Sequence, residues 1–132
     1  MLIDVQSMNV TSVVLDASAS IALLRREPGM DVVRKHLANA VISAVNYSEV
    51  LKKTIERGGA YEPVDAYVRS ASLEIVPFDT EQALSSAELY PLTRPHGMSF
   101  ADRACLNLGI RFAVHSRVLR LRQRSADYAA VP

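Results

Sequence analysis

The sequence contains a single cysteine, Cys105, and no run of apolar residues approaches the ~20 that are needed to cross a bilayer. One cysteine cannot form an internal disulfide, and no pair of cysteines or histidines has the spacing of zinc ligands. The first twelve residues lack the basic flank and the long apolar stretch of a signal peptide. We therefore expect a cytoplasmic protein that does not span a membrane.

The chain also lacks a glycine-rich phosphate-binding loop, which argues against a nucleoside-triphosphate enzyme. Its three histidines, His36, His96 and His115, are scattered, so a histidine metal site or a nucleophilic triad has little support. The composition is otherwise ordinary for a globular protein, with 49% hydrophobic and 22% charged residues. A length of 132 residues predicts one domain with one core.

Charge is distributed unevenly along the chain, although the formal net charge is only +1. Residues 1–102 carry nine Lys and Arg against thirteen Asp and Glu, whereas residues 103–132 carry six Arg against Asp127 alone. Such a basic segment favours a polyanionic partner, but it is also typical of a solvated surface. Two interpretations are open for four of these arginines: they bind along a nucleic-acid backbone, or they belong to an exposed tail. The four are Arg117, Arg120, Arg122 and Arg124.

Short apolar segments alternate with helical patterns throughout the sequence. Strands are expected at 13–15, 40–42, 73–78 and 110–114. Helices are expected at 18–24, 31–38, from 45 to the glycines at 58–59, 62–71, from 80 to the residues before Pro91, and from 100 to Gly109, with a loop at 91–97. This alternation predicts an α/β fold, because parallel strands require crossover helices that cover both faces of the sheet. Ligand sites in such sheets form at the carboxyl ends of the strands.

Three acidic residues fall at or near those strand ends. Asp16 ends the first strand, Glu49 lies in the opening turns of the helix after the second, and Asp102 lies in the first turn of the helix before the last. Carboxylates that converge repel one another, so a divalent ion is the natural compensation, and oxygen ligands suit Mg²⁺ or Mn²⁺. Each acid also has a structural interpretation: Asp16 and Asp102 can cap helices, and Glu49 can face solvent.

Four stretches carry a more specific pattern: 14–19 (VLDASA), 42–50 (ISAVNYSEV), 76–79 (VPFD) and 93–106 (TRPHGMSFADRACL). In this order, and at these separations, they resemble the PIN-domain ribonucleases, and specifically the VapC-type toxins of bacterial toxin–antitoxin pairs. The resemblance covers most of the region from residue 13 to residue 110. It implies a PIN-like three-layer α/β fold over a single domain, with residues 1–12 as an N-terminal extension and 115–132 as an atypical basic tail.

The resemblance implies a Mg²⁺- or Mn²⁺-dependent endoribonuclease in which Asp16, Glu49 and Asp102 are the catalytic, metal-binding acids. Ser18 matches a supporting position within the acidic site, where its structural alternative is an ordinary residue of the helix start. Arg94 and Arg117 are candidates for RNA binding. The implied protein partners are a second copy of the chain and a cognate antitoxin, whose C-terminal segment occupies a groove near the acidic site.

One departure from the family concerns a fourth acid, which usually follows the last strand. The chain has Ser116 at that position, so one negative charge is missing and a second ion would be weakened most. The alternative function is therefore a catalytically impaired PIN-domain protein that binds RNA or antitoxin without cleavage. A third interpretation, an aspartyl phosphotransferase with Asp16 as nucleophile, lacks the neighbouring acids and the positioned lysine that such enzymes use.

Overall fold

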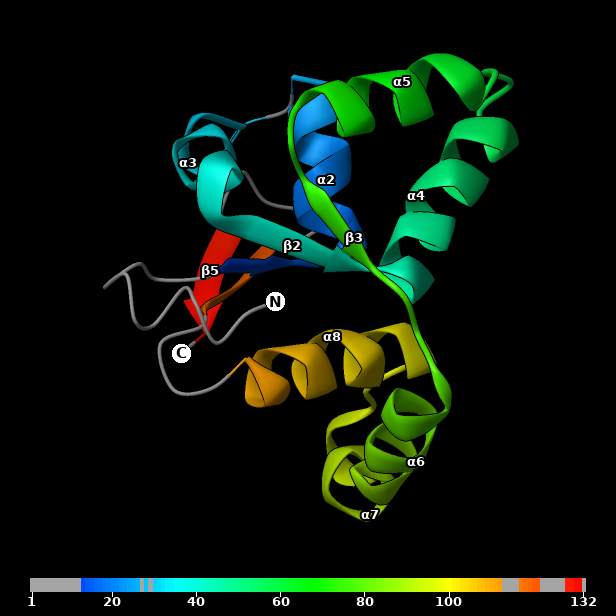
Figure 1. The fold of residues 1–132 in the computed structure, drawn as a ribbon, viewed down its shortest axis with the longest axis vertical. Helices are drawn as coiled ribbons and strands as arrows, with labels where there is room; N and C mark the ends of the chain where they lie inside the picture. Colours follow the sequence, from blue (N-terminus) through cyan, green and yellow to red (C-terminus); the bar gives the residue numbers. More distant parts are fainter. Residues whose placement is uncertain (1–12, 27, 29, 113–116, 122–127, 132) are drawn as a thin grey trace.

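The computed structural model describes residues 13–26, 28, 30–112, 117–121 and 128–131, and its centre is a β-sheet (Figure 1). The strands are β1 (Val13–Leu15), β2 (Ala40–Ser43), β3 (Glu74–Val76), β4 (Arg117–Leu121) and β5 (Tyr128–Val131), and their order across the sheet is β3-β2-β1-β4-β5. The first four strands in this order run parallel to one another, and β5 is antiparallel to β4. The predicted parallel sheet is thus confirmed.

Helices cover both faces of the sheet. On one side lie α2 (Ala17–Leu24), α3 (Met30–His36), α4 (Ala44–Glu56) and α5 (Glu62–Ser70), and on the other lie α6 (Thr80–Glu88), α7 (Tyr90–Thr93) and α8 (Phe100–Arg111) (Figure 1). Two short 3₁₀ turns, η1 (Leu37–Asn39) and η2 (Arg94–His96), complete the described elements. The α/β class and the three-layer arrangement expected from the sequence are confirmed. No helix in this part of the chain has the length and apolar character that a bilayer crossing requires.

The central strands are buried on both faces, and alternate side chains enter two separate cores. Val13 and Leu15 of β1 belong to the larger core, which β1 and β2 share with α2 to α5. Val14, between them, packs instead with Cys105 and Leu108 of α8. Burial on both faces explains why the sequences of these strands are continuous apolar runs. It also fixes α8 beneath β1, which determines where the first turn of α8 lies.

The strand predicted at 110–114 is wrong. Ile110 and Arg111 belong to α8 and Phe112 is its C-cap, while residues 113–116 lie outside the described residues. Gly109 does not end the helix, because a glycine inside a helix costs only about 1 kcal/mol and the packing of α8 against the sheet outweighs that cost. The fourth parallel strand is instead β4, further along the basic tail.

The loop predicted at 91–97 is also wrong in part, because α7 and η2 occupy most of it. Pro91 lies in the first turn of α7, where a backbone N–H has no hydrogen-bond acceptor within the helix, so proline is tolerated there. The turn ends at Gly97, whose φ of 64° lies in the left-handed region that glycine adopts without strain. A smaller difference concerns strand length, because the strand expected at 73–78 is limited to β3.

A polar contact ties α4 to α5 outside the sheet. The hydroxyl of buried Tyr47 donates a hydrogen bond to Asp65, whose carboxylate also accepts from the Arg69 Nε at 3.0 and 3.1 Å. Burial, together with this hydrogen bond, raises the pKa of Tyr47 to about 12. The same hydrogen bond lowers the pKa of Asp65. The pair therefore favours the neutral phenol beside the ionised carboxylate.

We predict that this contact makes stability depend on pH in the alkaline range. The folded-state pKa of Tyr47 lies above the ordinary value of 10.0, so its contribution is complete below pH 10 and is lost as the pH rises toward 12. Tyr47→Phe should lower the free energy of unfolding by about 1 kcal/mol at pH 7 and flatten its decline between pH 10 and 12. Urea unfolding at several pH values measures both effects. An equal change in the exposed control Tyr67→Phe would contradict the assignment.

Candidate active site

The first acid, Asp16, directly follows β1 and is only 8% exposed. Its Oδ1 accepts a hydrogen bond from the backbone N–H of Ala19 at 2.9 Å, so the side chain caps the start of α2. The Ser20 hydroxyl donates to the backbone oxygen of Asp16 at 3.1 Å. The helix-capping role that the sequence offered for Asp16 is therefore present, and it holds the carboxyl group at the carboxyl end of β1.

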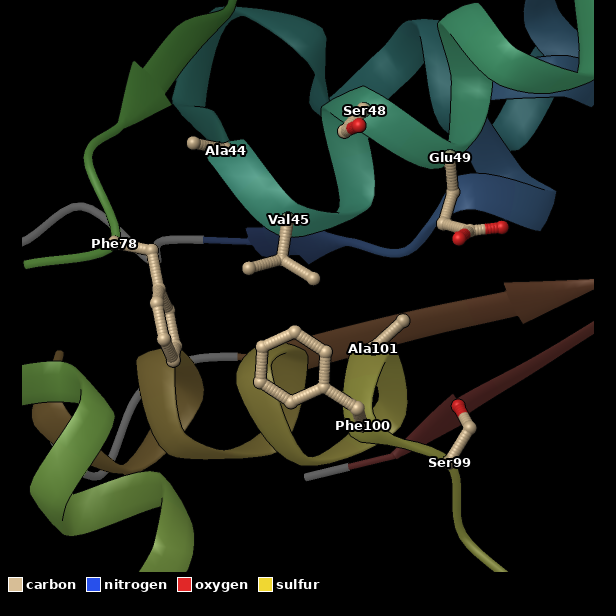
Figure 2. A pocket seen from close by; sticks show the side chains of 8 residues that line it. All are labelled: Ala44, Val45, Ser48, Glu49, Phe78, Ser99, Phe100 and Ala101. Carbon is tan, nitrogen blue, oxygen red and sulfur yellow. The ribbon is translucent and has the colours of Figure 1, made fainter.

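Glu49 reaches the same edge of the sheet from the neighbouring strand. Leu15 pairs with Ile42 in the parallel register, so the chain leaves β1 and β2 side by side. Ser43 then caps α4 by accepting a hydrogen bond from the Val45 N–H at 3.2 Å. Glu49 lies in the second turn of this helix and is half-buried. Figure 2 shows its carboxylate directed from α4 toward the first turn of α8.

Asp102 begins α8 as part of a complete capping box. The Ser99 hydroxyl accepts a hydrogen bond from the Asp102 N–H at 3.1 Å, and the Asp102 Oδ2 accepts from the Ser99 N–H at 2.9 Å. The helix-capping role that the sequence offered for Asp102 is therefore present. A fourth acid, Asp79, caps α6 in a similar way, since its side chain accepts a hydrogen bond from the Gln82 N–H at 2.9 Å.

A buried asparagine joins the helices that carry Glu49 and Asp102. The Asn46 Nδ2 donates a hydrogen bond to the backbone oxygen of Ala101 at 3.2 Å, and Asn46 is only 2% exposed. The two residues are 55 positions apart, so the sequence gives no sign of this link. The Asn46 Oδ1 is buried without a hydrogen-bond partner among the described residues. The link fixes the separation between the first turns of α4 and α8.

Between these first turns lies a groove with a volume of about 610 Å³. Its lining residues come from α4, from the segment after β3 and from the start of α8: Ala44, Val45, Ser48, Glu49, Phe78, Ser99, Phe100 and Ala101. In Figure 2, Glu49, Ala101 and Ser99 lie toward one end and Phe78 and Ala44 toward the other. The sequence did not predict this groove, because its residues are close only after α4 and α8 have packed together.

The three acids have the donor chemistry of a magnesium or manganese site, since carboxylate oxygens are the ligands that these ions prefer. Their elements are also neighbours: α4 packs against both α2 and α8, and α8 packs against β1. However, across the ranges that the structure describes, no three Asp, Glu, His or Cys side chains are gathered closely enough to hold an ion. Asp16 and Asp102 each direct an oxygen at an amide of their own helix instead.

The remaining candidate residues lie in different places. Ser18 is a half-buried residue in the first turn of α2, two positions after Asp16. Arg94 is exposed at the start of η2 and is not among the residues that line the groove. Arg117 begins β4 and pairs with Val13, which places its backbone at the opposite end of the parallel strands from Asp16. Ser116 lies outside the described residues.

Comparison with known proteins gives one family. Residues 13–111 match the PIN domain family, which is three quarters of the chain and includes all three acids. No curated protein matches the chain.

We predict that the Asn46 link contributes to stability. Asn46→Ala removes the hydrogen bond to Ala101 and leaves a small cavity, so the free energy of unfolding should fall by about 1–3 kcal/mol. Ser48→Ala, in the same helix but exposed, should change it by less than about 0.5 kcal/mol. Chemical denaturation of the two variants measures the difference. Equal effects would show that the link between α4 and α8 contributes nothing specific.

Proposed function

Because the chain belongs to the PIN-domain family, we propose that it is a divalent-metal-dependent endoribonuclease, the toxin component of a type II toxin–antitoxin module. PIN domains are generally nucleases that act on RNA or other nucleic acids, and they generally use divalent metal ions. The observation that carries the proposal is the convergence of the acid-bearing elements. The chain leaves β1 at Asp16, beside the start of α4. Asn46 links α4 to the first turn of α8, which carries Asp102.

In the proposed enzyme Asp16, Glu49 and Asp102 hold Mg²⁺ or Mn²⁺. When bound, such an ion supplies an activated water and neutralises the charge that develops on the phosphate during hydrolysis. The chain's own contribution is orientation. Helix caps fix Asp16 and Asp102, and Asn46 fixes the distance between α4 and α8. Ser18 supports the site, and Arg94 assists RNA binding from the exposed turn before α8.

The toxin assignment is supported by the four sequence stretches that resemble the VapC-type toxins. All four lie within the region that matches the PIN domain family. The assignment implies a cytoplasmic homodimer and a cognate antitoxin that covers the acidic site. The arginines that the sequence places in and after the segment at Arg117 would add affinity for RNA.

A second candidate is a PIN-domain protein that binds RNA or antitoxin without cutting. Two observations favour it: Ser116 replaces the usual fourth acid, and the described acids are not gathered into a ligand set. Ser116→Asp distinguishes the two candidates. A gain in Mg²⁺-dependent RNA cleavage by this variant would show that the missing charge limits catalysis, whereas unchanged inactivity of both proteins would favour the binding function.

The proposed nuclease is tested by replacing Asp16 with Asn. Asparagine caps a helix about as well as aspartate, so the fold should be retained while the carboxylate is lost. We expect Mg²⁺-dependent cleavage of single-stranded RNA to fall by about 100-fold or more, since a metal ligand supports several kcal/mol of transition-state stabilisation. The matched control is Asp31→Asn, an exposed acid in the first turn of α3. Undiminished cleavage by Asp16→Asn would overturn the mechanism.

A further inference from the structure

A second pocket, with a volume of about 230 Å³, lies where the ends of α2 and α4 meet the start of α5. In Figure 1, α5 crosses beside the ends of these two helices, on the side of the sheet opposite α8. Cations and apolar side chains dominate the lining of this basic pocket: Ile21, Leu24, Arg25, Lys53, Thr54, Arg57, Gly59 and Val64. No acidic residue is among them, so the pocket has the charge of an anion site.

The three cations of the basic pocket are not neutralised by the acids around them. Within the described ranges, Arg25, Lys53 and Arg57 form no ion pair, and their side chains form no hydrogen bond. Glu56 of the same helix pairs with Lys52 at 3.1 Å instead. Three like charges around one small volume repel one another, and a bound anion removes this repulsion.

The basic pocket lies further along the helices that carry two of the proposed acids. Asp16 directly precedes α2, and Arg25 directly follows it. On α4, Glu49, Lys53 and Arg57 are spaced by four residues, so they lie along one face, with Lys53 about 6 Å and Arg57 about 12 Å from Glu49 along the helix axis. The pocket contains no carboxylate that could bind an ion, so it suits a phosphate that is held and not cut.

We propose that the basic pocket binds a backbone phosphate of single-stranded RNA outside the acidic site. The proposal rests on the nuclease function proposed above, because that function supplies the RNA. Lys53 and the two arginines contact the phosphate oxygens, which a guanidinium can bind in pairs. The apolar side chains of Ile21, Leu24 and Val64 accommodate the C–H face of the ribose. Contacts of this kind depend on charge, so they add affinity for RNA without selecting a sequence.

An acidic protein segment has the same sign of charge, but two observations favour RNA. The chain belongs to the PIN domain family, whose members generally act on RNA or other nucleic acids, so a polyanionic ligand of this class is already expected. The pocket is also smaller than the roughly 300 Å³ at which ligand pockets usually begin. It therefore takes one phosphate and part of its sugar, and not a helix, whose diameter is about 10 Å.

The test compares two double variants that each remove one lysine and one arginine. Lys53→Gln with Arg57→Gln removes two cations of the basic pocket. The matched control, Arg34→Gln with Lys35→Gln, removes two exposed cations of α3 that do not line it. A third protein, Lys53→Arg with Arg57→Lys, exchanges the two pocket residues and keeps both charges.

Binding of a labelled single-stranded oligoribonucleotide to each protein is measured by fluorescence anisotropy over a series of salt concentrations. EDTA is present throughout, because it removes divalent ions and so prevents metal-dependent cleavage of the probe. Poly-L-glutamate is titrated as a second, protein-like polyanion. Thermal unfolding of each variant is measured alongside.

Each phosphate that is neutralised on a single strand contributes about 0.7 to the slope of log affinity against log salt. We therefore expect the pocket double variant to have a slope smaller by about 1.4, and to bind the RNA about 25-fold more weakly than the wild type in about 0.1 M salt. The α3 control and the charge-conserving exchange should both resemble the wild type.

Three results would overturn the inference. Equal losses in the two neutralised variants would show that only the total charge matters. A lower unfolding temperature with unchanged RNA affinity in the pocket variant would mean that its cations only stabilise the end of α4. A loss of poly-L-glutamate binding with unchanged RNA binding would assign the pocket to an acidic protein partner. If the wild type binds no RNA, the proposed nuclease function fails as well, whereas the three results above leave that function standing.

Discussion

The structure depends on the burial of β1 between two layers of helices. Val13, Val14 and Leu15 are fully buried, and their alternating side chains enter different cores above and below the sheet. Full burial of three apolar side chains contributes several kcal/mol, which no polar contact at the site approaches. The buried strand therefore fixes the position of Asp16, which follows it directly. The packing of α8 against β1 fixes the position of the helix whose first turn carries the Ser99 and Asp102 cap.

Two of the three acids proposed to bind the ion have structural roles. Asp16 caps α2 and Asp102 caps α8, and each uses an oxygen to accept a backbone N–H. These hydrogen bonds orient the two carboxylates, and no three acids among the described residues are gathered into a ligand set. The structural interpretation of these residues does not exclude the functional one, because a carboxylate has two oxygens and can accept several bonds. Glu49 differs, since it reaches into a groove from the side of α4.

Local patterns in the sequence predicted the parts of the fold that are fixed locally. The strands β1 and β2 and the starts of α6 and α8 could be predicted, because apolar runs and capping residues act over a few positions. The end of α8 could not, since Gly109 is tolerated only through the packing of the helix on the sheet. The link from Asn46 to Ala101 and the groove beside it depend on contacts between distant segments, so one sequence gives no sign of either.

The central claim is that Asp16, with Glu49 and Asp102, provides a site for a divalent ion. Titration of Mn²⁺ into the purified protein, followed by the electron paramagnetic resonance signal of the free ion, tests this claim directly and independently of RNA cleavage. The account predicts saturable binding by the wild type and by Asp31→Asn, and at least ten-fold weaker binding by Asp16→Asn. Equal Mn²⁺ affinity in all three proteins would contradict it.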